Sequence, residues 1–270
     1  MSVFNWCQKS KERWHLYCCG VKIFSCKSGW LTRTRKNQWF EACLRRYQDL
    51  NHDRRFSINR SDLWVCLDDN TDTTGFDTHY EYHQAWAIRK VKQINPARHV
   101  DIASKLTFNA CLSAFLPVDF FDYRPALLKL DNLRCLHANL TQLHFETGSI
   151  QSLSCMHTVE HVGLGRYGDP IDPEGDIKAI KELKRVLAPG GNLLFVVPVG
   201  LPRLQYNAHR IYSYEMIIEY FSDLTLIEFS LISDNALETG IITHAAAELV
   251  ARQKCGCGCF WFRKDVLEKS

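Results

Sequence analysis

The chain has 270 residues, of which 46% are hydrophobic and 23% charged, so it can bury a sizeable globular core. Its net charge of +3 is too small to argue for a nucleic-acid partner, which we disfavour. No apolar run approaches the length of a membrane span, no signal peptide is visible, and the twelve cysteines do not form a disulfide scaffold. We therefore expect a cytoplasmic protein with reduced thiols.

Basic residues are concentrated near the start of the chain, over residues 9–60. We expect a basic, aromatic N-terminal extension over 1–40 and a helical or irregular lead-in segment over 41–95. The lead-in ends at Asn95-Pro96, after apolar residues at helical spacing. A basic segment is usually a solvated face, but residues 9–60 also allow a peripheral contact with an anionic surface.

From residue 96 to 264, short apolar runs alternate with helical patterns, as expected for a parallel sheet with crossover helices. The clearest helix is Asp176–Leu187, which Pro189-Gly190-Gly191 is expected to end before the next strand. A tail follows at 265–270. The predicted strands are His99–Ala103, Val118–Asp122, Leu133–Ala138, Ile150–Met156, Asn192–Val197, Leu224–Ile232 and Cys257–Arg263.

Three segments resemble class I S-adenosylmethionine-dependent methyltransferases. Glu182–Pro198 joins an amphipathic helix, a Pro-Gly-Gly turn and a buried strand, like the fourth-to-fifth strand connection of that family. Ser154–His161 and Leu136–Phe145 resemble the segments at the ends of its fourth and third strands. The resemblance implies an α/β fold with a Rossmann-like, mostly parallel sheet of seven strands. The last strand is antiparallel, helices flank the sheet, and S-adenosyl-L-methionine is the expected cofactor.

Four further segments resemble one branch of this superfamily, called domain of unknown function 268. They read FDTHYEYHQAW (76–86), HVGLGRYGDPIDPEGD (161–176), YNAHRIY (206–212) and CGCGCFWFRK (255–264). This resemblance covers residues 60–264 and implies a fold and a cofactor, but no substrate.

We expect the cofactor at the carboxyl ends of the first strands. Asp122 is the candidate acceptor for the ribose hydroxyls, with Asp119 as the alternative, and Asn139 stands where relatives have an Asp that accepts from the adenine amine. The first loop contains no glycine, unlike that of the superfamily, and its Cβ atoms restrict positive φ values. The expected cofactor residues are Asp101, Ala103, Ser104, Asp122, Asn139, Leu140 and His157.

The acceptor is expected between the loops Glu160–Tyr167 and Tyr206–Tyr212. His209 is the candidate general base and Arg210 the candidate partner of a phosphate or carboxylate. Gly163, Gly165 and Gly168 are expected to let the acceptor loop Glu160–Tyr167 close over a substrate. The expected catalytic residues are Glu160, His161, His209 and Arg210. The expected reaction is O-methylation of a hydroxyl on a sugar, a polysaccharide precursor or another small molecule.

Metal binding is weighed at two places. Some methyltransferases use similar residues for a divalent ion, so Glu160, His161 and His209 form a candidate set, although a metal-free pocket is favoured. His157–His161 also has the spacing of a zinc-protease motif, but that motif needs a helix and these residues follow a strand. Cys255–Cys259 is better explained as the last strand of the sheet than as a zinc site.

A second function remains open. A relative that keeps the sheet but has lost the cofactor would act as a non-catalytic binding or scaffold protein. The glycine-free first loop favours this alternative, whereas the intact acceptor loops favour the enzyme. The sequence leaves the oligomeric state open.

Overall fold

The computed structural model describes residues 4–10, 13–18, 21–52 and 55–266, and it divides into two compact units, 1–75 and 76–270. The expected tail therefore lies outside the described residues from 267 on. The second unit begins at Phe76 and not at Pro96, because the helix of the lead-in segment packs into its core. Among the described residues, no helix is long and apolar enough to cross a membrane.

The first unit contains regular structure in the segment expected as an extension. Three strands, β1 (Phe4–Ser10), β2 (Arg13–Cys18) and β3 (Val21–Lys27), form an antiparallel sheet. Helix α1 (Ser28–Leu50) follows and runs across the boundary expected at residue 40, and η1 (Arg60–Asp62) is a short 3₁₀ turn.

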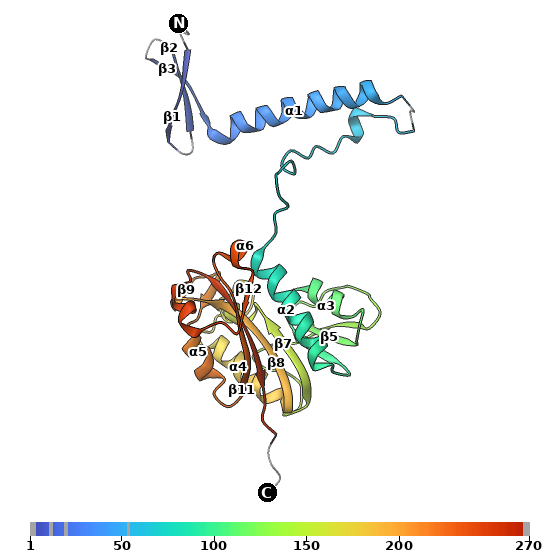
Figure 1. The fold of residues 1–270 in the computed structure, drawn as a ribbon, viewed down its shortest axis with the longest axis vertical. Coiled ribbons are helices and arrows are strands. Elements are labelled where there is room, and N and C mark those ends of the chain that lie inside the picture. Colours follow the sequence, from blue (N-terminus) through green and yellow to red (C-terminus); the bar gives the residue numbers. More distant parts are fainter. Residues whose placement is uncertain (1–3, 11–12, 19–20, 53–54, 267–270) are drawn as a thin grey trace. The chain divides into compact units, whose positions relative to one another are not determined.

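The second unit is built on one eight-stranded sheet with the order β12-β11-β13-β8-β7-β4-β5-β6 (Figure 1). Neighbouring strands from β6 to β8 are parallel, and β13 lies antiparallel between β8 and β11. This order confirms the Rossmann-like methyltransferase sheet, to which β12 adds a short edge strand. The strands are β4 (His99–Ile102), β5 (Val118–Asp122), β6 (Leu133–His137), β7 (Ile150–Met156), β8 (Leu187–Val199), β11 (Thr225–Ile232), β12 (Ile241–Thr243) and β13 (Gly256–Arg263).

Helices cover both faces of this sheet (Figure 1). Helices α2 (Thr78–Ile94) and α3 (Leu106–Leu112) bury apolar side chains on one face, and α4 (Gly175–Val186) and α5 (Tyr214–Tyr220) do so on the other. The remaining elements are η2 (Val159–His161), β9 (Arg203–Gln205), β10 (His209–Ile211), α6 (Ala236–Thr239) and η3 (Ala247–Arg252).

Helix α2 is fixed to the sheet by both apolar and polar contacts. It begins where the Asp77 side chain accepts a hydrogen bond from the Tyr80 amide, and it ends at Asn95 in the left-handed conformation. Glu228 on β11 accepts from Trp86 Nε1 at 3.0 Å and from Lys90 Nζ at 2.5 Å. The middle of α2 is therefore held in place beside the sheet.

The Pro-Gly-Gly segment lies inside β8 and not before it. Strand β8 begins at Leu187, directly after α4. A Cβ on Gly191 would lie 2.8 Å from the Ala188 carbonyl oxygen and 2.9 Å from that of Ile150, so only glycine fits there. The expected turn is thus a close passage at the start of the strand.

Candidate functional site

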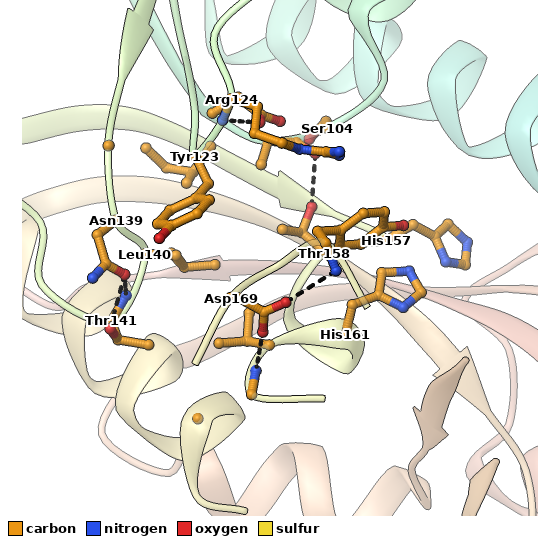
Figure 2. A pocket seen from close by; sticks show the side chains of 18 of the residues that line it. Ser104, Tyr123, Arg124, Asn139, Leu140, Thr141, His157, Thr158, His161 and Asp169 are labelled. Atoms are coloured by element: carbon orange, nitrogen blue, oxygen red, sulfur yellow. Dashed lines mark hydrogen bonds between the residues drawn. The ribbon is translucent and has the colours of Figure 1, made fainter. Parts of the chain in front are cut away.

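A cavity of about 510 Å³ opens at the carboxyl ends of β4, β5, β6 and β7 (Figure 2), and we call it the strand-end pocket. Most of the expected cofactor residues line it, together with His161 from the acceptor side. The lining residues are Tyr80, Ile102, Ala103, Ser104, Lys105, Asp122, Tyr123, Arg124, Ala138, Asn139, Leu140, Thr141, Met156, His157, Thr158, His161, Val162, Gly163, Tyr167, Asp169, Pro170, Asp172 and Gly175.

Asp101 supports the pocket from beneath and does not line it. Its buried carboxylate accepts from the Ser104 amide at 3.0 Å, from Ser104 Oγ at 2.6 Å and from Asn109 Nδ2 at 2.9 Å. The Ser154 hydroxyl is a fourth donor. Burial raises the pKa of Asp101 to about 6 in spite of these bonds. Asp101 therefore fixes the conformation of the loop that follows β4.

The loop that follows β4 contains no glycine, yet it takes a backbone conformation that glycine favours. Ala103 has a φ of 57°, in the left-handed region. Its amide donates to the Phe121 carbonyl at 2.7 Å, and its carbonyl accepts from Thr158 Oγ1 at 2.9 Å. These bonds hold the conformation that the Cβ disfavours, and both Ala103 and Ser104 line the pocket.

The ends of β5 and β6 place polar groups at the pocket. Asp122 lines it, with Oδ1 accepting from the Arg124 amide at 2.7 Å. The alternative candidate, Asp119, is instead bound by the guanidinium groups of Arg98 and Arg134 outside the pocket.

Asn139 differs from the sequence expectation in the atom that it offers. Its Oδ1 accepts from the Thr141 amide at 3.0 Å and from Thr141 Oγ1 at 2.8 Å (Figure 2). The oxygen expected to accept from adenine is thus occupied by the local turn, which leaves the NH₂ group, a donor, for a ligand.

Glu160 lies between two histidines behind the pocket wall. His157 Nδ1 is 2.9 Å from Glu160 Oε1, and His161 Nε2 is 3.6 Å from the same oxygen. His161 Nδ1 donates to the Ala208 carbonyl at 2.6 Å, so its Nε2 faces Glu160 as a lone pair unless it is protonated. Burial raises the pKa of Glu160 to about 7. Glu160 and His161 are therefore suited to share one proton near neutral pH.

The second expected acceptor loop, Tyr206–Tyr212, supports the first acceptor loop, Glu160–Tyr167, and does not line the strand-end pocket. Residues 206–212, within the β9–β10 hairpin, are not among the lining residues. Arg210 donates to the Val162 carbonyl at 2.7 Å and to the Pro173 carbonyl at 3.2 Å, so its guanidinium holds the first acceptor loop in place. The His209 ring lies 6.3 Å from that of His161, and its buried Nε2 has no hydrogen-bond partner among the described residues.

Gly163 fixes the first acceptor loop where freedom to close was expected. Its φ is 80°, and a Cβ there would lie 2.0 Å from the Asp172 carbonyl oxygen. Its amide donates to Asp169 Oδ2 at 2.9 Å (Figure 2). This glycine permits a close approach of two backbone segments.

Several lining residues were not predicted from the sequence. Lys105 Nζ lies 4.5 Å from the ring centroid of Tyr80, and both side chains line the pocket. The guanidinium groups of Arg124 and Arg166 lie 4.7 and 5.1 Å from the Tyr167 ring centroid. Tyr80 belongs to the FDTHYEYHQAW segment, but only the packing of α2 brings it here.

The metal-ligand set found among the described residues differs from the expected one. Ligand atoms of His79, His157 and Cys257 all lie within 4.8 Å of one another, and no other set of three His, Cys, Asp or Glu residues in the described ranges does so. Glu160, His161 and His209 are neighbours but do not form such a set. The Cys255–Cys259 segment is in the last strand, as expected: Cys257 and Cys259 are buried on β13.

Residues 135–243 match the family model described as "Caenorhabditis protein of unknown function, DUF268". No curated protein matches the chain. Similar solved structures include the YcgJ protein of Bacillus subtilis, which is 16% identical. The match covers 68% of this chain and 99% of that chain, with a TM-score of 0.48. The N-methyltransferase NodS of Bradyrhizobium japonicum WM9, in complex with S-adenosyl-l-homocysteine, is 15% identical. The match covers 70% of this chain and 89% of that chain, with a TM-score of 0.45.

The structure of the [4+2]-cyclase SpnF is also similar and is 14% identical. The match covers 67% of this chain and 81% of that chain, with a TM-score of 0.44. At these identities the likeness does not reach beyond the fold, so the chemistry has to be argued from the site. By its own strand order the chain has the class I methyltransferase fold, and over residues 135–243 it resembles the family described as Caenorhabditis protein of unknown function, DUF268.

Proposed function

We propose that the strand-end pocket binds S-adenosyl-L-methionine and that the protein is a methyltransferase. The observation that carries this proposal is the convergence of Ser104, Asp122 and Asn139, from three different strand ends, on one cavity. Its volume of about 510 Å³ lies within the range of about 300–1,000 Å³ typical of small-molecule sites. In open α/β sheets, ligands bind outside the carboxyl ends of the strands.

The polar groups of the pocket fit the nucleoside part of this cofactor. The carboxylate of Asp122 is suited to accept hydrogen bonds from ribose hydroxyls, while the Asn139 NH₂ group is suited to donate to a ring nitrogen of adenine. Leu140 supplies an apolar, buried side chain beside them. When bound, the cofactor would supply an activated methyl group.

We propose that the acceptor is a hydroxyl of a sugar or another small molecule, positioned near His161. His161 lines the pocket, and Glu160 behind it can take up the proton that the hydroxyl loses. Arg166 and Tyr167 offer a cation and an aromatic face at the rim. His209 and Arg210 act in this proposal as supports of the loop, because the pocket lining does not include them.

The alternative is a non-catalytic binding or scaffold protein. The observation in its favour is the glycine-free loop after β4, which places Ala103, a residue with a Cβ, in the pocket lining in a left-handed conformation.

Calorimetric titration of the full chain with S-adenosylmethionine and S-adenosylhomocysteine separates the two functions. We expect binding of both, and Asp122→Ala should weaken it by about 1.5–3 kcal/mol, the usual range for hydrogen bonds to charged groups. Asp131→Ala, an exposed carboxylate outside the pocket lining, is the control and should bind as the wild type does. Absence of binding to the folded wild-type protein would favour the scaffold.

A further inference from the structure

Three histidines and a cysteine from distant parts of the sequence meet behind the strand-end pocket. His79 and His83 lie one turn apart on α2, His157 follows β7, and Cys257 is on β13. The ring centroid of His157 lies 5.6 Å from that of His79, with the two rings nearly parallel, and 5.0 Å from that of His83. Only His157 among these four also lines the pocket, so most of the cluster has no part in the proposed methyl transfer.

The hydrogen bonds of the cluster fix where its lone pairs point. His157 Nδ1 donates to the Glu160 carboxylate at 2.9 Å, which leaves a lone pair on Nε2, and this atom lies 3.3 Å from Cys257 Sγ. Histidines that bind metals usually donate their other ring nitrogen to a carboxylate in this way. His157 therefore has the tautomer and the second partner of a metal ligand.

His83 leaves a second lone pair unmatched. Its Nδ1 donates to the His79 carbonyl at 2.6 Å, so Nε2 is the unprotonated nitrogen of the neutral ring. That atom is buried and has no hydrogen-bond partner in the described part of the chain, and the same holds for Glu160 Oε2. Leaving such buried groups without a hydrogen-bond partner destabilises the fold. A cation within the cluster would offset this cost.

We propose that His79, His157 and Cys257 bind a zinc ion, with His83 Nε2 as the candidate fourth ligand. Imidazole and thiolate are the donors that zinc prefers. Zinc bonds of about 2.0–2.3 Å in tetrahedral geometry put neighbouring ligand atoms about 3.3–3.8 Å apart. The His157–Cys257 separation of 3.3 Å meets this condition, and the ligand atoms of all three residues lie within 4.8 Å of one another. The ion would join α2, β7 and β13.

Cobalt(II) is the probe that tests this site, because a thiolate bound to cobalt gives a charge-transfer absorption that a hydrogen-bonded thiol does not. The full chain, freed of metal by a chelator, is titrated with cobalt(II) and then with zinc. We expect saturation at about one cobalt per chain, a charge-transfer band, and its loss as zinc displaces cobalt. Metal analysis of protein purified without chelator should find about one zinc per chain.

Matched variants assign the ligands. Cys257→Ser should lose the charge-transfer band, whereas Cys259→Ser should keep it, because Cys259 is equally buried on the same face of β13 but lies outside the ligand set. His79→Gln, at a partly exposed position, should weaken cobalt binding at least tenfold and leaves a folded protein for comparison if Cys257→Ser does not fold.

Two outcomes would overturn the proposal: a folded wild-type chain that gives no charge-transfer band with cobalt, or a band that Cys259→Ser abolishes and Cys257→Ser retains. Binding of copper alone would overturn the assignment to zinc. None of these measurements uses S-adenosylmethionine, so they stand apart from the proposed methyltransferase activity.

Discussion

The two ends of the strand-end pocket are built differently. At one end, which we call the cofactor end, Ser104, Asp122 and Asn139 lie at or just after strand ends. Asp122 and Asn139 are held by hydrogen bonds to nearby residues, whereas Ser104 bonds both to Asp101 and to the Met156 amide. At the other, which we call the histidine end, His157 and His161 share Glu160 and contact residues far away in the sequence, on α2, β13 and the β9–β10 hairpin.

This difference separates residues suited to bind a ligand from residues suited to bind protons or metal ions. The local bonds of the cofactor end orient ordinary polar groups, as a site for a fixed ligand requires. The histidine end buries several ionisable groups together, and burial raises the pKa of Glu160 to about 7 while it lowers that of His157 to about 4. Buried ionisable groups with shifted pKa values are typical of sites where protons or metal ions are bound.

The largest effect on stability is expected at the base of the cofactor end. Asp101→Ala removes the acceptor of four buried hydrogen bonds, which come from Ser104, Asn109 and Ser154. We expect the free energy of unfolding to fall by about 3–5 kcal/mol, measured by urea denaturation. Asp131→Ala is the control and should change it by less than about 0.5 kcal/mol. A loss below about 1 kcal/mol would show that the first loop does not depend on Asp101.

At the histidine end, His161→Ala should lower turnover about 10²-fold or more, because the proton acceptor at the pocket wall is lost. The measurement is release of S-adenosylhomocysteine with a panel of sugars and phenols as acceptors. Cofactor affinity should stay unchanged. His209→Ala should have a smaller effect, and a larger one would return His209 to the role of general base.

Asn139→Asp sharpens the comparison from the cofactor side. One carboxylate oxygen can still accept from Thr141, but the other replaces the NH₂ donor and faces the lone pair of the adenine ring nitrogen. We expect S-adenosylhomocysteine to bind about five- to tenfold more weakly in calorimetry, since a hydrogen bond is lost and two acceptors oppose each other. Asn139→Ala should weaken binding, and tighter binding by that variant would contradict a contact between Asn139 and the adenine.

The smallest effect is expected at Ala103. The left-handed conformation costs a residue with a Cβ about 1–2 kcal/mol, whereas glycine loses about 0.5–1 kcal/mol more chain entropy on folding. Ala103→Gly should therefore stabilise the protein by about 0.5 kcal/mol in urea denaturation. Ala138→Gly, at a buried pocket position that is not in the left-handed region, should destabilise it by a similar amount.

The sheet could be predicted because its buried strands are continuous apolar runs. Strands β5 and β7 have the predicted bounds, and β4 and β6 end one residue early. The short strands β9, β10 and β12 have no such runs and were missed. Asp122 and Asn139 could be placed at the pocket because Asp122 ends a predicted strand and Asn139 directly follows one.

The set of three candidate metal ligands could not be predicted in the same way. Cys257 lies 100 residues after His157, His79 lies on a different element from both, and no local pattern indicates that α2 lies beside β13. The sequence likewise shows that Asn139 is an amide, but not that its oxygen is used by Thr141.

The clamp that Arg210 forms across the first acceptor loop has a kinetic consequence. Arg210 binds the carbonyl groups of Val162 and Pro173, and Gly163 is in close contact with Asp172, so both ends of the segment 162–173 are fixed. The movable part of the rim is the partly exposed ring of Tyr167 between Arg124 and Arg166. Exposed side chains change rotamer in picoseconds to nanoseconds, whereas loops that act as lids open in microseconds to milliseconds. Ligand entry should therefore follow a single exponential whose rate rises linearly with ligand concentration, without a plateau set by a slow opening step.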